Sequence, residues 1–298
     1  LNNDDYPNRK WYDDDEYAGG AGFQQMGKAH ANPAVAREAL ELIAHIVAND
    51  LPFTEVVTAD YTVVNPFSAV SFGVEGAVQF NDPLDPDEFQ PVALPGIPHA
   101  GVLTSQMVLN RFPTTDTNRN RHRSRTVWDL FLATDIMKLA ERPIDPTSIE
   151  DHNPTMFNPD CTACHAALDP IAGAFQNWNA TGRYLPPSEG WYPEMRPPGF
   201  GDESIPYDQK TEALRWLGQQ IAKDERFVTA VIRTTWYGLT GQYPLPVPSE
   251  DEEGTDETYQ ARSVAHQAQQ GIFTAAGAVF VESDFNYRVL VGDLVNNA

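Results

Sequence analysis

Apolar side chains recur along much of the chain at intervals of three and four residues, which is the period of one helix face. The first such stripe covers residues 35–46. Asn32 is a suitable N-cap and Pro33 a suitable first helical residue, so a helix is expected to begin there. Glu38, Glu41 and His45 share the opposite face and are expected at the surface.

Further stripes predict helices over residues 102–109 and 126–141, and four more helices between residue 207 and the end of the chain. Residues 51–65 fit a helix and a strand equally well. Residues 66–100 and 179–206 are rich in Pro and Gly and predict long loops. Because no sustained alternation of apolar and polar residues occurs, the predicted fold class is mainly α, with helical modules joined by long Pro/Gly-rich loops.

The charge of the chain limits its partners. The formal net charge is −22 over 298 residues, which argues against nucleic acid and against an anionic membrane surface as partners. No apolar run approaches the ~20 residues of a membrane-spanning helix. The acidic clusters within residues 1–29 lack the loop glycine and terminal glutamate of a calcium-binding EF-hand, which favours a solvated arm.

The two cysteines of the chain, Cys161 and Cys164, are followed at once by His165. This C-x-x-C-H spacing is typical of covalent haem c attachment, in which both thiols bind one porphyrin edge and the histidine binds the iron. A redox dithiol would need a βαβ pattern, and a structural zinc would need further ligands at short spacing. Neither pattern is present, and a chance pair of buried thiols is disfavoured because cysteine is otherwise absent.

Several residues are candidates for further contacts with one covalent haem c. Arg183 and one arginine of residues 119–125 are candidate partners of the propionates; alternatively, these arginines begin a solvated helix. Met195, in a Pro-rich loop, is the first candidate for the distal iron ligand. It could instead fill a gap in the core. The other possibilities are an open position and the rivals His152, Met156 and His99.

Haem is attached to C-x-x-C-H motifs after export in bacteria, so we expect a periplasmic or extracellular protein from which a leader, or a longer N-terminal part, has been removed. The motif also suggests a division of the chain. We expect an acidic N-terminal arm (1–30), an N-terminal helical module (31–145), a haem c-binding segment (146–206) and a C-terminal helical module (207–298).

Six short pieces of the chain resemble the C-terminal, cytochrome-bearing modules of planctomycete-type cytochrome c domain proteins. The pieces are Leu-Pro-Phe-Thr-Glu at 51–55 with Thr-Ala-Asp-Tyr at 58–61, Gly-Val-Leu-Thr at 101–104, Asn-Pro-Asp-Cys-Thr-Ala-Cys-His at 158–165 with Asp-Pro at 169–170, and Thr-Gly-Arg-Tyr at 181–184. The resemblance covers most of residues 31–295. It implies export, one haem c, and helical modules before and after it, but it implies no substrate.

Three functions are compatible with these patterns. The first is a monohaem c-type cytochrome that carries electrons, which requires a redox partner protein or further copies of itself, as a homo-oligomer or polymer. The second is a haem-dependent oxidoreductase, peroxidase-like or acting on extracellular polymers, with an open or labile sixth iron position. The third is a structural or assembly module that the haem stabilises.

Overall fold

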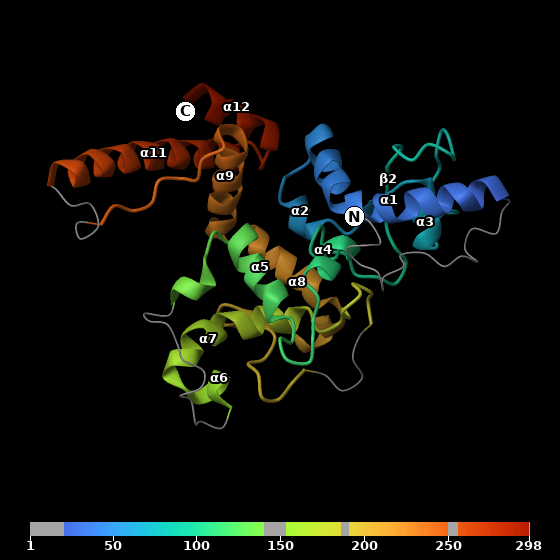
Figure 1. Cartoon of the computed structure of the whole chain (residues 1–298), viewed down its shortest axis with the longest axis horizontal. Helices are drawn as coiled ribbons and strands as arrows, with labels where there is room; N and C mark the ends of the chain where they lie inside the picture. Colours follow the sequence, from blue (N-terminus) through green and yellow to red (C-terminus); the bar gives the residue numbers. More distant parts are fainter. Residues whose placement is uncertain (1–20, 140–152, 186–190, 250–255, 298) are drawn as a thin grey trace.

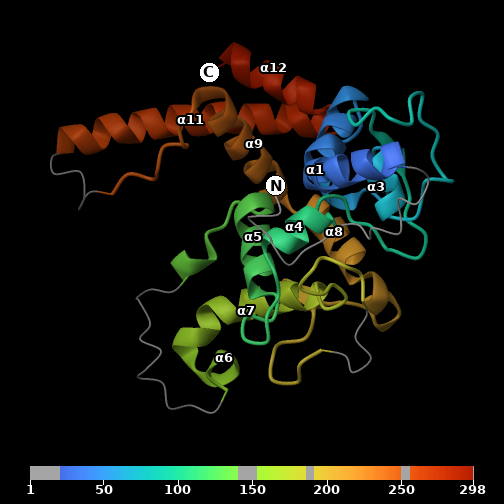
Figure 2. The same cartoon turned by 45° about the vertical axis from the view of Figure 1, so that its right-hand side comes forward.

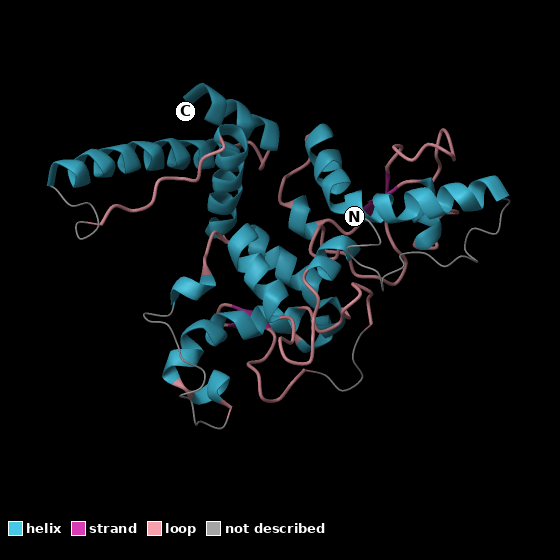
Figure 3. Ribbon diagram, viewed as in Figure 1, coloured by secondary structure: helices cyan, strands magenta, loops and turns pink. Residues whose placement is uncertain are grey.

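The computed structural model describes residues 21–139, 153–185, 191–249 and 256–297. Helices dominate these residues, and the named strands form two short two-stranded sheets (Figure 3). The predicted fold class, mainly α, is confirmed. None of the described helices is both long and apolar enough to cross a lipid bilayer.

The first part of the chain forms a bent helix beside a small sheet. Helix α1 spans Ala21–Ala48, so the prediction that it begins at Asn32 is wrong: Pro33 lies inside the helix, which loses one backbone hydrogen bond there and continues. Figure 1 shows α1 as two stretches at an angle. The following elements are α2 (Glu55–Thr58), β1 (Thr62–Val64), α3 (Pro66–Ser71) and β2 (Gln90–Val92), and β2 pairs with β1 antiparallel.

The segment 51–65, which fitted helix and strand equally well, contains both. Helix α2 comes first and β1 follows it, and all three residues of β1 are buried. Residues 66–100 form long loops as predicted, interrupted by α3 and β2. Asn65 begins α3 with a capping box: its side chain accepts hydrogen bonds from the backbone of Phe67 and Ser68, and its own backbone N–H donates to the Ser68 hydroxyl.

The middle of the chain carries the C-x-x-C-H motif. Helix α5 begins at Arg121 and ends at Phe131, so the predicted span of residues 126–141 is wrong at both ends. Left-handed residues flank the helix, Asn120 before it and Ala133 after it, and no periodicity reveals such a break. The other elements here are α4 (Gln106–Arg111), the 3₁₀-helix η2 (Ile136–Leu139), α6 (Pro154–Phe157) and α7 (Pro159–Ala174).

The last part of the chain contains the four closing helices that the sequence predicts. They are α8 (Ala213–Lys223), α9 (Glu225–Thr240), α11 (Asp256–Glu282) and α12 (Tyr287–Asn297), preceded by β3 (Gly199–Phe200), β4 (Glu203–Ser204) and the 3₁₀-helix η4 (Tyr207–Glu212). Helix α11 packs on α9 and α12, and one end of it extends away from the body of the molecule (Figures 1 and 2).

Helix α7 is packed into the main hydrophobic core. That core joins buried residues of α1, α2, α5, α7, α8, α9, α11 and α12 in one cluster, which runs from Ala39 to Leu294. A smaller cluster lies under α3 and β2. The C-terminal half of α7 is buried almost completely, whereas its N-terminal half, with the C-x-x-C-H motif, is half-buried. The motif therefore lies where the core meets the surface. The four-segment division stays a prediction.

Candidate functional site

The candidate site is built on the first two turns of α7. Asn158 caps this helix by accepting hydrogen bonds from the backbone N–H groups of Asp160 (3.0 Å) and Cys161 (3.3 Å), and Pro159 occupies the first helical position. A proline suits that position because its missing N–H would have no partner there. The local sequence therefore fixes the start of the helix, and with it the direction in which the motif side chains leave.

Cys161, Cys164 and His165 occupy neighbouring positions on this helix. Residues three and four apart share a helix face, so both cysteines and the histidine project from adjoining faces of α7. Neither cysteine is in a disulfide: Cys161 is half-buried, and Cys164 is buried with its Sγ 3.3 Å from the carbonyl oxygen of Ile136. Both thiols are therefore reduced, and they lie at the boundary between core and solvent.

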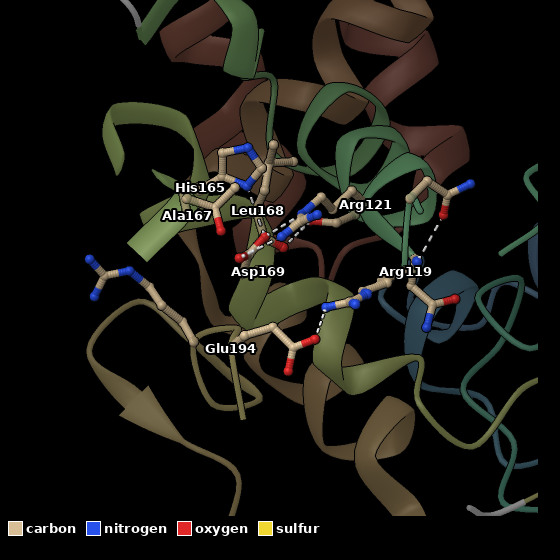
Figure 4. Close-up of polar contacts among 12 residues, drawn as sticks. Arg119, Arg121, His165, Ala167, Leu168, Asp169 and Glu194 are labelled. Atoms are coloured by element: carbon tan, nitrogen blue, oxygen red, sulfur yellow. Dashed lines mark hydrogen bonds and ion pairs between the residues drawn. The ribbon is translucent and has the colours of Figure 1, made fainter. Parts of the chain in front are cut away.

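His165 is oriented by a carboxylate one helical turn further along. Its Nδ1 lies 3.1 Å from Oδ1 of Asp169, which is completely buried (Figure 4). Arg121 of α5 binds the same carboxylate at both oxygens, with Nε at 2.7 Å from Oδ1 and an Nη at 3.1 Å from Oδ2. The three side chains form a connected polar group that fixes the imidazole ring relative to two helices.

The charges of this group decide the tautomer of His165. Burial alone would raise the pKa of Asp169, but the hydrogen bonds from His165 and Arg121, together with the Arg121 charge, hold that pKa below its usual value. An ionised carboxylate can only accept hydrogen bonds, so Nδ1 of His165 carries the proton that it shares with Asp169. In the neutral ring Nε2 then keeps a lone pair, and Nε2 is the atom left to bind a metal.

Helix α5 is held against α7 by side-chain bonds to backbone carbonyl groups. Ser124 Oγ donates to the carbonyl of Leu168 (2.7 Å), and Trp128 Nε1 donates to that of Ala167 (3.3 Å). Pro170 lies inside α7, two residues after Leu168 and three after Ala167. A proline inside a helix opens the helix locally, so that nearby carbonyl groups become accessible to other donors. The Asp169-Pro170 pair therefore supplies both the carboxylate and the local opening.

The arginines of residues 119–125 have different roles. Arg123 is buried and donates to the carbonyl oxygens of Phe112, Leu109, Trp178 and Asn179, so it is a structural residue that holds together three segments of backbone. Arg119 pairs with Glu194 at 2.5 Å (Figure 4). It also lies over the Tyr192 ring. Arg125 is exposed. The expectation that one of these arginines meets a haem propionate stays a prediction.

The loop that carries Met195 is attached close to the motif. Its neighbour Glu194 binds Arg119, and the Glu194 carbonyl accepts a hydrogen bond from Asn153, which precedes α6 (3.0 Å). The loop continues to Pro198, which packs directly against Gly173 of α7, where a Cβ would clash at 2.7 Å. The Met195 side chain is buried. The loop therefore crosses α7, and iron ligation by Met195 stays a prediction.

The rival ligands are in different surroundings. Met156 is half-buried on α6, directly before α7, and α6 packs on α7. His152 lies outside the described residues. His99 is buried, 3.2 Å from the Thr104 hydroxyl, and lines a cavity together with Glu38 and Arg183. Arg183 follows the C-terminal end of α7, whereas His165 is in its N-terminal half; contact with a propionate stays a prediction for Arg183 as well.

The surroundings of the motif fit an apolar prosthetic group. Two elements that pack on α7 leave large apolar side chains exposed: Met137 and Leu139 on η2 (56% and 45% exposed) and Phe157 on α6 (70%). Exposed apolar side chains grouped beside two thiols and a free imidazole nitrogen are suited to covering a porphyrin.

Among the described residues, no group of three or more His, Cys, Asp and Glu side chains is placed to hold a metal ion.

Sequence reasoning missed two functional candidates. Asp169 stands four residues after His165 on one helix, a spacing that puts both on one face and could have revealed the pair. Glu38 was expected at the surface, which is wrong: it is buried and accepts hydrogen bonds from Thr62, Ser105 and the backbone of Gln106. Strand β1 and the start of α4 cover that face of α1, and a local pattern does not show such contacts.

The fold and the site define a mainly α protein in which one helix presents a C-x-x-C-H motif. A family model described as PSCyt3, a protein of unknown function (DUF1588), matches residues 99–186, which include α4 to α7 and the motif. This is a cytochrome c-related domain family, in agreement with the resemblance noted in the sequence. No curated protein and no solved structure matches the chain.

Proposed function

We propose that this protein is an exported c-type cytochrome that carries electrons through one covalently attached haem c. The observation that carries the proposal is the arrangement on α7. Two cysteines that are not in a disulfide stand three residues apart, and they are followed by a histidine whose Nδ1 is hydrogen-bonded and whose Nε2 keeps its lone pair. When bound, the haem would supply one-electron redox chemistry at its iron.

Cys161 and Cys164 would hold the porphyrin through thioether bonds. Each thiol would add across one vinyl group, so that a carbon–sulfur bond forms, the thiol hydrogen moves to the other vinyl carbon, and no electrons are gained or lost. Cys164 would give up its contact with the Ile136 carbonyl in this step. Residues Met137, Leu139 and Phe157 would cover the apolar edge and exclude water from it.

His165 would bind the iron through Nε2, and Asp169 would act on it from the other side of the ring. A hydrogen bond from Nδ1 to a carboxylate makes an imidazole a stronger electron donor and fixes its orientation. Arg121 weakens that effect, because it binds the same Asp169 carboxylate. Asp169 is therefore proposed as the positioning residue of the proximal ligand.

For the distal position we propose Met195, whose buried side chain lies in a loop bound to Arg119 and packed on α7. Absorption spectra of the ferric and ferrous holoprotein test this assignment. Low-spin iron in both states, with a thioether charge-transfer band that disappears in Met195→Ala, supports Met195. If the band and the low-spin spectrum persist in that variant, Met195 is not the ligand, and His152, Met156 and His99 follow in turn.

A second function is favoured by one observation, the His165–Asp169 contact. A strongly donating proximal histidine stabilises oxidised iron, which suits a haem-dependent oxidoreductase with an open or labile sixth position. Addition of carbon monoxide to the ferrous protein and cyanide to the ferric protein separates the two functions. Rapid binding of both ligands by the unmodified protein supports the oxidoreductase, and resistance to both supports electron transfer.

The partner and the location are part of the same proposal. One haem carries electrons only a short distance, so a redox partner protein or further copies of this chain, in an oligomer or polymer, would supply the next centre. Haem is attached to such motifs after export in bacteria, so we propose that the protein works in the periplasm or outside the cell. A net charge of −22 favours a partner with a basic surface.

A further inference from the structure

A second candidate site lies away from the C-x-x-C-H motif, in a cavity of about 270 Å³ between α1, the start of α4 and the segment after α7. Its wall includes Glu38, His99, Trp178, Arg183 and Tyr184. Three residues of the Thr-Gly-Arg-Tyr piece at residues 181–184 line it: Gly182, Arg183 and Tyr184. Gly182 allows a close approach there, since a Cβ would lie 2.8 Å from the Gln106 carbonyl oxygen.

His99 offers an unused hydrogen-bond acceptor at this cavity. The Thr104 hydroxyl donates to the Gly101 carbonyl (2.9 Å), so toward His99 it can only accept, and Nδ1 of His99 is the donor. Nε2 therefore carries the lone pair, and it is buried without a hydrogen-bond partner among the described residues. Burial, aided by the Arg215 charge, lowers the pKa of His99 to about 4, so the ring is neutral at physiological pH.

Unlike Nε2 of His99, the carboxyl oxygens of Glu38 already accept hydrogen bonds from neighbouring residues. Its two carboxyl oxygens accept three hydrogen bonds: Thr62 Oγ1 at 2.6 Å, Ser105 Oγ at 3.2 Å and the Gln106 backbone at 3.3 Å. Burial raises its pKa to about 7, so its negative charge is weak near neutral pH. Glu38 is therefore a polar part of the cavity wall that offers little attraction to an ammonium group.

Arg183 supplies positive charge at the cavity wall. Its side chain is exposed at the cavity wall, and its guanidinium forms no hydrogen bond or ion pair with any residue that the structure describes. An uncompensated arginine in a chain with a net charge of −22 is available to an anionic ligand. Beside it, the rings of Trp178 and Tyr184 lie 5.4 Å apart and give the wall an aromatic surface.

We propose that this cavity binds a monosaccharide-sized polyhydroxy carboxylate, that is, a sugar acid. A ligand hydroxyl would donate to Nε2 of His99, the ligand carboxylate would accept from Arg183, and the carbon face of the ligand would lie against Trp178 and Tyr184. The site goes beyond the haem function, since none of its residues belongs to the C-x-x-C-H group. It assigns Arg183 and His99 to the cavity, in place of the propionate contact and the iron ligation for which they were candidates.

Isothermal titration calorimetry on the full holoprotein tests the proposal with D-glucuronate, D-galacturonate and D-gluconate as probes. D-Glucose, which lacks the carboxylate, acetate, which lacks the hydroxyls, and D-glucosamine, which is cationic, are the comparison ligands. At least one sugar acid is expected to bind with saturation and at least tenfold more tightly than each comparison ligand. Failure of all three sugar acids to bind with saturation, or preferential binding of glucosamine, overturns the proposal.

Variants locate the binding. Arg183→Ala and His99→Gln are each expected to weaken sugar-acid binding at least tenfold, with partial retention in Arg183→Lys. Arg125→Ala removes the same charge from an exposed position on α5 and is expected to bind as the unmodified protein does. Arg183 is exposed, so its variants test the site even if His99→Gln fails to fold. Equal binding by Arg183→Ala and the unmodified protein would show that the ligand lies elsewhere and the assignment is wrong.

Discussion

Replacement of Asp169 by asparagine tests the polar group on which the candidate site depends. In the native chain this fully buried carboxylate accepts two bonds from Arg121, whose side chain is 20% exposed, and one from His165. Asparagine keeps the size of the side chain but removes the charge. Its amide NH₂ can only donate hydrogen bonds, so it would face an N–H donor of Arg121 or His165 without an acceptor between them. Arg121 then stays largely buried without its counter-charge.

The size of the effect follows from that geometry. Removing one partner of a buried ion pair costs about 3–5 kcal/mol, and the residual exposure of Arg121 places this case at the lower end, roughly 3 kcal/mol. In chains of somewhat smaller size, each kcal/mol of lost stability lowers the melting temperature by about 2–4 °C. The melting temperature of Asp169→Asn should therefore fall by roughly 6–12 °C. Circular dichroism melts and urea unfolding of the holoprotein measure both quantities.

The matched control is Asp129→Asn, which removes one carboxylate from an exposed position on α5. It should change the free energy of unfolding by no more than about 0.5 kcal/mol. In Asp169→Asn the reduction potential should also rise, because the proximal histidine loses its carboxylate partner. Equal stability of the two variants would refute the reasoning about the buried group, and an unchanged potential would refute the role assigned to Asp169 toward His165.

Three further predictions concern the framework around the site. Arg123→Met should lower the free energy of unfolding by about 3–5 kcal/mol, because buried carbonyl groups lose their donor, whereas Arg125→Met, on the same helix, should stay within about 0.5 kcal/mol; equal urea midpoints would contradict this. Burial raises the pKa of Glu38 from 4.5 to about 7, so the folded state binds an extra proton between these values, and stability that is present below pH 4.5 is lost as the pH rises through 7. Relative to Glu38→Gln, the unmodified protein should therefore lose about 3 kcal/mol of stability between pH 4.5 and 8 in urea titrations, and a pH-independent difference would show that this carboxyl is not perturbed. Gly218→Ala should destabilise the fold by about 2 kcal/mol or more, because its Cβ would lie 2.0 Å from a carbonyl oxygen of α2, and Gly271→Ala, with open space in α11, should stabilise it by about 0.4–1 kcal/mol; the same sign for both variants in thermal melts would count against these contacts.

The helices could be predicted from the sequence where packing follows local periodicity. The four closing helices have clear stripes and were found, and the C-x-x-C-H motif is a local signal. The start of α1 was misplaced because Pro33, which usually marks a helix start, lies inside a helix that begins twelve residues before it. The helix α5 was misplaced because its first turns carry arginines, one of which is buried by bonds to distant backbone.

The candidate site could be predicted only as far as its motif. The cysteines and His165 are adjacent in the sequence, and Asp169 lies one helical turn further on, so local reasoning reaches all four residues. The other contacts are long-range. Arg121 binds Asp169 across 48 residues of chain, and Glu194 binds Arg119 across 75. The burial of Glu38 depends likewise on segments 24 to 68 residues away, which no periodicity encodes.

The central claim, one haem held by Cys161 and Cys164, is tested most directly by intact mass spectrometry of the protein made with haem maturation and then extracted with acidified acetone. We expect the colour to stay with the polypeptide and the mass to equal that of the chain plus one haem. Cys161→Ala/Cys164→Ala should lose both the added mass and the retained colour. A bare-chain mass for the unmodified protein, with the haem in the acetone phase, would contradict the account.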